Sequence, residues 1–387
     1  MKKYFAMTAI ALALSSAAHA EVRINGFANL VGGMTSSDDT LYGYDDNISF
    51  SEDSLFAIQI SGDINDKMTA TAQLLARGAE DYDPDFEWAY LTYAASDNLT
   101  ITAGRFRLPL FTYSSSLDVG YSYHWLSVPS VVYDVPFNNM DGIKIAKTGL
   151  VGDWDYLLDI NFGQFKGETF GADNIGDNTG LVSLQFSDGE WTVRGVYGRT
   201  STTIDLTRST DPVGLSVGQG FAALESLGFA ELAGNLKIEE DTGEFVGVSV
   251  TYDNFDYFWG AEYTNVKVDD SFANDDDAFY LTAGKRFGKW TPSITYESFE
   301  SSGDVKYANK IAAIGAAPLP AEVIAQLMGV AIGSQMAQQD EFDVVTATIR
   351  YDFDTNIAIK ADVSRYSDDV DASADATLVR FGVNYVF

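Results

Sequence analysis

Apolar and polar side chains alternate along most of the chain, in segments of about ten residues. The clearest segment is the last one, ATLVRFGVNYVF, in which every second residue from Thr377 to Phe387 shares one face. Arg380, Gly382 and Asn384 share the other face. Side chains of a β-strand point alternately to the two faces of a sheet, so this pattern predicts strands with one apolar face. Soluble sandwiches show the same alternation.

The number and spacing of these segments separate the two possibilities. We predict sixteen strands, at residues 22–34, 54–63, 68–77, 86–95, 98–107, 140–148, 153–163, 180–187, 190–200, 244–252, 255–266, 278–287, 290–300, 341–353, 356–367 and 376–387. The connections after even-numbered strands are short, and those after odd-numbered strands are long. An even strand count with one short-turn end and one long-loop end is typical of antiparallel barrels in bacterial outer membranes.

Aromatic residues cluster beside the short turns, at the strand ends that would lie at one membrane interface. Trp154, Trp191 and Trp290 each follow a short turn. Aromatic belts mark the interfaces of membrane barrels, and closure of the barrel pairs every backbone group. The sequence therefore predicts an all-β fold, a transmembrane antiparallel β-barrel that forms a single domain over residues 21–387.

Residues 1–20 have the features of an export signal. Lys2 and Lys3 form a basic start, 5–14 is apolar, and Ala18-His19-Ala20 is a small-x-small cleavage site. The apolar stretch is too short for the alternative, a membrane anchor. We expect cleavage near Glu21 and export from the cytoplasm.

Composition excludes several classes of function. The 387 residues include 24 Lys and Arg, 56 Asp and Glu and no cysteine, for a net charge of −32. So acidic a chain does not bind a nucleic-acid backbone, and without cysteine it has neither disulfides nor thiolate metal sites. A hydrophobic content of 46% with 13% aromatic residues argues against disorder. No cofactor, metal or nucleic-acid partner is implied.

With these features the chain resembles the general porins of Gram-negative outer membranes. The resemblance rests on the leader, the sixteen strands, the terminal Phe387 and the segment GRFRLPLFTYSSSLDVGYSYHWLSVPSVVYDVPF at 104–137. It implies a homotrimer of water-filled channels for ions and small hydrophilic solutes, in a bilayer with lipopolysaccharide. It also implies insertion by the barrel-assembly machinery, with a C-terminal signal formed by Phe381, Tyr385 and Phe387. The acidic PEFGG-type motif of enteric porins is absent.

In that family the third extracellular loop folds inward and narrows the channel. The corresponding connection here, 108–139, is rich in tyrosine, serine and proline and nearly uncharged. We expect it inside the barrel; the alternative is a surface loop packed on its neighbours. The candidates for the constriction are Arg77, Arg105, Arg107, Asp118, Tyr121, Tyr123, His124, Tyr133 and Asp134.

Arg105 and Arg107 share strand parity with the apolar Ile101 and Ala103, which would point them toward the lipid. A mid-membrane arginine on the lipid face costs roughly 2–4 kcal/mol, which favours an inward direction. The alternative is that they snorkel to the lipid headgroups.

Strand parity predicts a set of charged side chains on the inner wall. These are Arg23, Lys144, Arg194, Glu262, Glu297, Arg350, Lys360, Asp362 and Arg380. We expect most of them to solvate the lumen, with local pairs between Arg350 and Asp352 and between Lys360 and Asp362.

Two further features lie in the long connections. Four of them, 35–53, 78–86, 266–278 and 367–375, are strongly acidic, which fits either a solvated face or bridging to lipopolysaccharide through divalent cations. Helices are predicted at Phe221–Leu236 and Ala321–Gln338, packed over the pore mouth or against each other.

Two other functional classes fit an outer-membrane barrel. A structural or adhesive barrel would conduct poorly. A barrel hydrolase would need a catalytic histidine, and His124 is the only one outside the leader.

Overall fold

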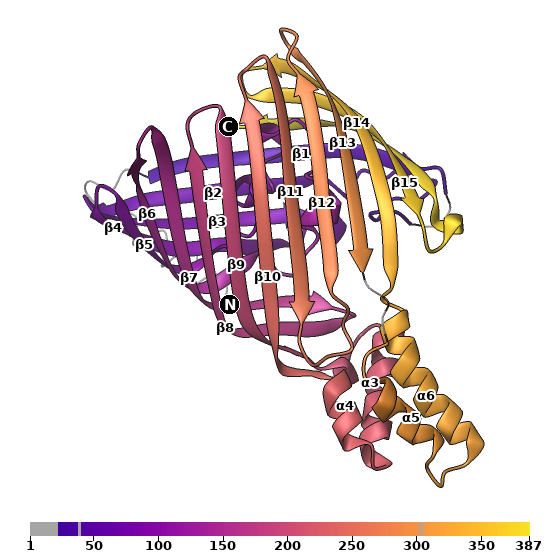
Figure 1. Cartoon of the computed structure of the whole chain (residues 1–387). Helices are drawn as coiled ribbons and strands as arrows, with labels where there is room; N and C mark the ends of the chain where they lie inside the picture. Colours follow the sequence, from indigo (N-terminus) through magenta and orange to yellow (C-terminus); the bar gives the residue numbers. More distant parts are fainter. Residues whose placement is uncertain (1–21, 38–39, 302, 304) are drawn as a thin grey trace, which may run out of the picture.

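The computed structural model describes residues 22–37, 40–301, 303 and 305–387, so the predicted leader lies outside the described residues. Sixteen strands in this part of the chain form one closed antiparallel barrel, as predicted (Figure 1). They are β1 (Val22–Thr35), β2 (Leu55–Asn65), β3 (Met68–Arg77), β4 (Pro84–Ser96), β5 (Leu99–Arg107), β6 (Asn139–Val151), β7 (Trp154–Thr169), β8 (Ala172–Ser187), β9 (Trp191–Ile204), β10 (Ile238–Asp253), β11 (Tyr257–Val268), β12 (Asp276–Lys285), β13 (Trp290–Ser301), β14 (Asp340–Asp354), β15 (Ile357–Asp368) and β16 (Ala376–Val386).

The barrel closes between its first and last strands. β1 pairs with β16 from Phe27 opposite Val386 to Thr35 opposite Leu378. Along β16 the side chain of Phe381 is 48% exposed, whereas Leu378 is fully buried. The predicted alternation therefore separates an apolar outer face from an inner face. Because no strand has a free edge, the backbone groups of the wall are paired in the sheet.

The predicted strands were too short at the long-loop end between β7 and β10. β7 and β8 continue until a turn at residues 170–171, and β9 and β10 extend to residues 204 and 238. These extensions carry bulges, with register shifts between Gly163 and Phe165 and between Asp177 and Gly180. A bulge shifts the alternation by one residue, which hides a strand from a search for strict period two.

Four helices form a lobe beyond the end of the barrel that is opposite the C-terminus (Figure 1). The connection from β9 to β10 contains α3 (Pro212–Ser226) and α4 (Ala230–Leu236), and that from β13 to β14 contains α5 (Ala308–Gly315) and α6 (Ala321–Met336). They pack against one another through buried side chains that include Leu224, Leu236, Ile314 and Ala331. Of the two arrangements predicted for the loop helices, packing against each other is confirmed.

Local signals set the bounds of these helices. The Asp211 carboxylate accepts a hydrogen bond from the Gly214 backbone N–H, and Pro212 occupies the first helical position, so α3 begins earlier than predicted. Gly228, with φ of 96°, separates α3 from α4. Among the described residues, no helix is long and apolar enough to cross a membrane.

The remaining helical segments are short. They are α2 (Ser130–Tyr133) and the single turns η1 (Gly78–Glu80), η2 (Ser114–Ser116), η3 (Gly120–Ser122), η4 (Leu206–Arg208) and η5 (Ala372–Ala374). Three of them, η2, η3 and α2, belong to the connection between β5 and β6.

Closure of the barrel depends on a glycine beneath the terminal phenylalanine. A Cβ atom at Gly26 would collide with the Phe387 ring and lie 2.7 Å from the Ala57 carbonyl oxygen. We expect Gly26→Val to destabilise the barrel by about 1–3 kcal/mol, the usual cost of overpacking. The unfolding midpoint of the purified protein in urea measures the effect. Gly62→Val is the control, since its Cβ atom would meet only Val22, at 4.0 Å; equal midpoints for both variants would contradict the prediction.

Candidate functional site

The connection between β5 and β6, residues 108–138, contacts inward-facing side chains around much of the barrel. The Trp125 indole donates a hydrogen bond of 2.8 Å to Thr295 on β13, and Asn29 on β1 donates one of 3.0 Å to the Asp118 carbonyl. The Thr112 hydroxyl bonds Ser249 on β10 at 2.7 Å. Because these strands lie far apart around the wall, we conclude that the segment crosses the barrel interior. We call it the inner loop.

Basic side chains of the wall bind the backbone carbonyls of the inner loop. Lys360 is 1% exposed, and its ammonium group donates to the carbonyls of Gly120, Tyr123 (2.8 Å) and Trp125 (2.6 Å). Arg350 donates to two loop carbonyls, including that of Tyr123 at 2.7 Å. A buried ammonium group needs such partners to offset its lost hydration. The prediction that these residues solvate an open lumen is therefore wrong, because the loop occupies that space.

Arg194 and Arg380 hold other parts of the loop. Arg194 donates to the carbonyls of Pro109 and Leu110, the latter at 2.8 Å. Arg380 bonds the Ser127 hydroxyl at 2.7 Å.

The local pairs predicted on β14 and β15 have different outcomes. Arg350 lies 2.8 Å from the carboxylate of Asp352, which confirms that pair. The predicted pair of Lys360 with Asp362 is wrong. The Lys360 ammonium group donates its hydrogen bonds to carbonyls of the inner loop, and Asp362 pairs with Arg380 at 2.8 Å.

Acidic side chains of the wall bind the N–H and O–H groups of the same loop. Glu262, 2% exposed, accepts hydrogen bonds from the Thr112 backbone N–H and the Tyr133 hydroxyl, both at 2.8 Å. Glu297 accepts one from the Val131 backbone N–H at 3.2 Å. A loop inside a barrel has no strand beside it to pair with its backbone, and these wall carboxylates supply that pairing.

The aromatic side chains of the inner loop are packed against the wall. The His124 ring lies 4.0 Å from that of Trp125 and 4.4 Å from that of Phe258, and its Nε2 atom is 3.1 Å from the Thr282 hydroxyl. Burial, and then the nearby positive charge of Lys360, hold the pKa of His124 well below its ordinary value, so the ring is neutral at physiological pH.

Two predicted constriction residues, Tyr123 and Tyr133, are buried between the loop and the wall. We correct their assignment, because buried side chains do not line an open path. His124 is packed against the rings of Trp125 and Phe258 and keeps part of its surface exposed. Tyr121 remains partly exposed, and its hydroxyl bonds the Thr355 carbonyl at 2.7 Å, in the short turn between β14 and β15.

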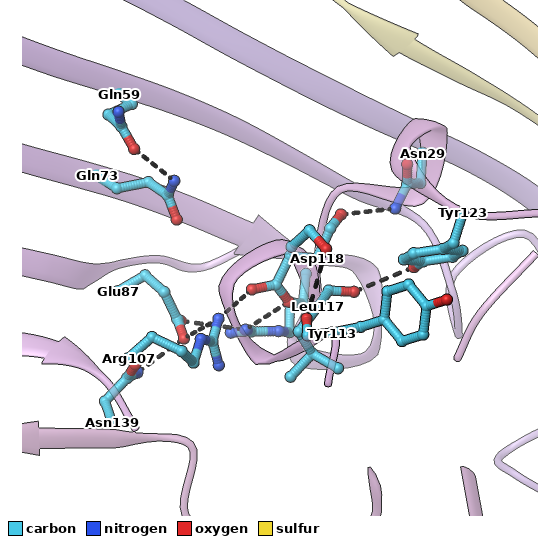
Figure 2. Close-up of polar contacts among 12 residues, drawn as sticks. Asn29, Gln59, Gln73, Glu87, Arg107, Tyr113, Leu117, Asp118, Tyr123 and Asn139 are labelled. Atoms are coloured by element: carbon cyan, nitrogen blue, oxygen red, sulfur yellow. Dashed lines mark hydrogen bonds and ion pairs between the residues drawn. The ribbon is translucent and has the colours of Figure 1, made fainter. Parts of the chain in front are cut away.

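Two arginines and two carboxylates meet where the inner loop approaches β3, β4 and β5 (Figure 2). Arg77 lies 3.1 Å from both Glu87 and Asp118. Arg107 lies 2.9 Å from Glu87 and also pairs with Asp118. Asn139 donates a hydrogen bond of 2.7 Å to Glu87. We call Arg77, Glu87, Arg107 and Asp118 the charge cluster; its formal charges cancel.

The charge cluster matches the sequence prediction in three of its four members. Arg77 and Arg107 face the inner loop, and Asp118 is its acidic partner. The prediction missed Glu87 because it lies at a bulge of β4, where the pairing shifts between Gln73 and Leu74 and the strand parity is broken.

The prediction that Arg105 points inward is wrong. Its guanidinium group pairs with Asp141 on the neighbouring strand β6 at 2.9 Å, on the outer face of the barrel. The two side chains are 41% and 46% exposed and lie near the long-loop end of the strands. The paired carboxylate compensates the charge there, so the predicted cost of an outward arginine does not apply.

The other predicted residues lie outside this cluster. Arg23 pairs with Asp63 at 2.7 Å at the short-turn end of the barrel. The ammonium group of Lys144 lies 5.5 Å from the centre of the Phe106 ring. Asp134 is exposed to a separate cavity lined by Leu108 and other side chains, and burial raises the pKa of its carboxyl.

The acidic connections do not form a cation site in the described part of the chain, where no group of three or more acidic, histidine or cysteine side chains could hold a metal ion. One acidic residue of these connections, Asp53, contacts an arginine of the barrel wall instead. Asp53 accepts hydrogen bonds from Tyr44 and Arg380, both at 2.9 Å.

The barrel is closed and antiparallel, its outer face is apolar, and the loop inside it is held by hydrogen bonds to the wall. These features define the class of membrane-spanning β-barrel channels. Residues 6–387 match the family described as Gram-negative porin. The chain belongs to that family. It is an outer-membrane channel for passive diffusion, and a search of curated protein sequences finds no match.

Solved structures share the fold at low sequence identity. The outer-membrane channel DcaP of Acinetobacter baumannii is similar with 10% identity and a TM-score of 0.57, over 96% of this chain and 99% of that one. An anion-selective porin from Comamonas acidovorans has 11% identity and a TM-score of 0.55, over 95% and 100%. The trimer form of in-vitro-folded OmpT, an outer-membrane protein of Vibrio cholerae, has 10% identity and a TM-score of 0.53, over 95% of this chain and 99% of that one.

Lys360 provides a test of how the inner loop is held. Replacing it with methionine leaves the carbonyls of Gly120 and Trp125 without their donor, while that of Tyr123 keeps Arg350. The cost is about 1–3 kcal/mol for each buried group that stays unpaired. We expect a lower urea midpoint and noisier single-channel currents, because the loop becomes free to move. Lys147→Met, on the outer face of β6, is the control. A Lys360→Met channel as stable and as quiet as the parent would contradict this assignment.

Proposed function

We propose that solutes pass between the inner loop and the wall formed by β2–β8. Inward-facing Gln59, Thr92 and Lys144 on that wall remain partly exposed. On the opposite wall the inward-facing Glu262 and Lys360 are only 2% and 1% exposed, because the loop covers them. Gln73 and Asn161 on the β2–β8 wall are also buried, at 2% and 1%. The partial exposure of Gln59, Thr92 and Lys144 is the single observation that carries the proposed path.

The charge cluster borders that path at its long-loop side. Arg77 is its most accessible member, with 29% of its side chain exposed, whereas Arg107 and Glu87 are 6% and 7% exposed. Arg77 is therefore the arginine that a passing ion would meet, and the buried members hold it in place. Arg105, on the outer face, makes no part of the constriction.

The ion preference follows from two fields of different range. The acidic connections concentrate cations at the mouth, but salt screens that field within about 8–10 Å. The charge cluster has no net charge and acts at close range, where each fixed charge has a larger effect. We therefore propose a channel for small hydrophilic solutes and ions with a mild preference for cations at low salt.

Assembly and membrane partners follow from the family. We propose a homotrimer, which the trimer form of the structurally similar OmpT supports. Export through the leader at 1–20, insertion by the barrel-assembly machinery through Phe381, Tyr385 and Phe387, and contact with lipopolysaccharide at the long-loop end belong to the same proposal. A band of trimer size in unheated mild detergent is expected, and a monomer band alone would contradict the homotrimer.

We further propose that the chain performs no chemical step. A barrel hydrolase needs an accessible histidine beside its partner, whereas His124 is packed between the rings of Trp125 and Phe258. A structural or adhesive barrel is separated from a channel by conductance in planar bilayers, where a channel gives discrete current steps.

Two arginine variants test the path. Arg77→Ser removes the accessible positive charge and leaves Glu87 and Asp118 in excess, so we expect a wider pore and a stronger cation preference. Arg105→Ser is the matched control and should change neither property, because its side chain faces outward. Reversal potentials across a salt gradient in planar bilayers measure the preference. If Arg105→Ser shifts the reversal potential and Arg77→Ser does not, the path is wrong.

A further inference from the structure

A cavity of about 210 Å³ lies between the two ends of the inner loop and the inner surface of β7–β11. It is separate from the charge cluster. Its walls are mainly apolar and include Leu108 and Leu110 from the start of the loop, Phe137 from its end, and Phe165, Phe245 and Val266 from the barrel. An apolar cavity of about 150 Å³ can accommodate benzene, so this one has room for an aromatic ring with a short substituent.

Glycine at position 198 keeps the cavity open. Gly198 on β9 lines the cavity, and a Cβ atom there would have Leu181 Cδ1 as its nearest neighbour, at 3.4 Å. Its backbone φ is not in the left-handed region, so a larger side chain would fill the space without backbone strain. A side chain at position 198 would therefore reduce the empty volume.

The charges inside the cavity are all negative. Asp134 from the loop and Asp276 from β12 line it, and the Asp276 carboxylate has a hydrogen bond with Ser301. Three other charged residues, Arg199, Glu244 and Lys267, contribute to its lining from strand positions whose side chains point to the outer face. On that face Lys267 pairs with Asp269 at 2.8 Å, and Glu244 accepts a hydrogen bond from Tyr197.

Two polar groups in the cavity lack a partner within the described part of the chain. The side chain of Asp134 is exposed, and no ion pair or side-chain hydrogen bond to its carboxylate is found in the described residues. Asn274 is 4% exposed, its amide nitrogen donates to the Gln335 carbonyl, and its Oδ1 atom has no donor. A buried acceptor without a donor costs free energy that a ligand carrying N–H groups would recover.

We propose that this cavity binds small amphipathic organic cations, with the apolar body of the ligand against Leu108, Phe137 and Phe245 and its ammonium group at Asp134. Anions of the same shape are excluded, because they would lie beside two unneutralised carboxylates. Neutral molecules of the same shape gain only the apolar contacts, without an ion pair to Asp134. The site adds saturable binding to passive diffusion and does not depend on the proposed path, since binding requires no current.

Calorimetry on the purified full-length barrel in detergent tests the site. The probes are 2-phenylethylammonium, neutral 2-phenylethanol and the anion 3-phenylpropionate. We expect the ammonium probe to bind at least roughly tenfold more tightly than the alcohol, as for hydrogen bonds to a charged group, and the anion to give no heat of binding. Equal affinities for the cation and the anion, or no binding of the cation, would overturn the proposal.

Two variants and their controls locate the binding. Asp134→Asn should reduce the affinity for the ammonium probe to that for the alcohol, and Gly198→Leu should abolish binding of both. Asp83→Asn, in the connection between β3 and β4, and Gly195→Leu, on the same strand as Gly198 but facing outward, should change neither. Binding that survives Asp134→Asn unchanged overturns the proposal, even if Gly198→Leu fails to fold.

Discussion

Pairing of backbone hydrogen-bonding groups away from water is the constraint on which this structure depends. In the wall the constraint is met by closure, because β1 pairs with β16 and no strand edge faces lipid. The inner loop meets the same constraint differently. Its carbonyls are bound by Lys360 and Arg350, and its N–H groups by Glu262 and Glu297, so the charged residues of one wall act as a framework for an irregular segment.

This arrangement divides the inner surface of the barrel into two parts. Glu262, Arg350 and Lys360 on one side bond the loop. Gln59, Thr92 and Lys144 on the other side remain partly exposed. A charged residue of the first part costs a great deal to remove, since its loss leaves an unpaired group in a buried site. Lys144, which is partly exposed and has no ion pair among the described residues, can change more freely.

The long-loop end carries a separate structural unit. The four helices have their own buried cluster, which includes Phe221, Leu232 and Leu327. Aromatic contacts such as that between Phe221 and Phe272, at 5.6 Å, connect this cluster to the connection between β11 and β12. Apolar sequence in an extracellular loop is explained by this packing, and no membrane contact is required for it.

The sequence by itself determined the barrel, because period two, strand number and the lengths of the connections are local properties of the chain. It also determined which side of the wall most charged residues occupy, and it identified Arg77, Arg107 and Asp118. Only the tertiary structure decided what those residues contact. Lys360 and Glu262 become buried because a segment more than a hundred residues away in the sequence lies over them. Glu87 joins the charge cluster through a bulge, and Arg105 stays outside because Asp141 on the next strand compensates its charge. Strand parity predicts only the face of the sheet to which a side chain points. Its burial and its partners depend on which distant segments the closed barrel brings together.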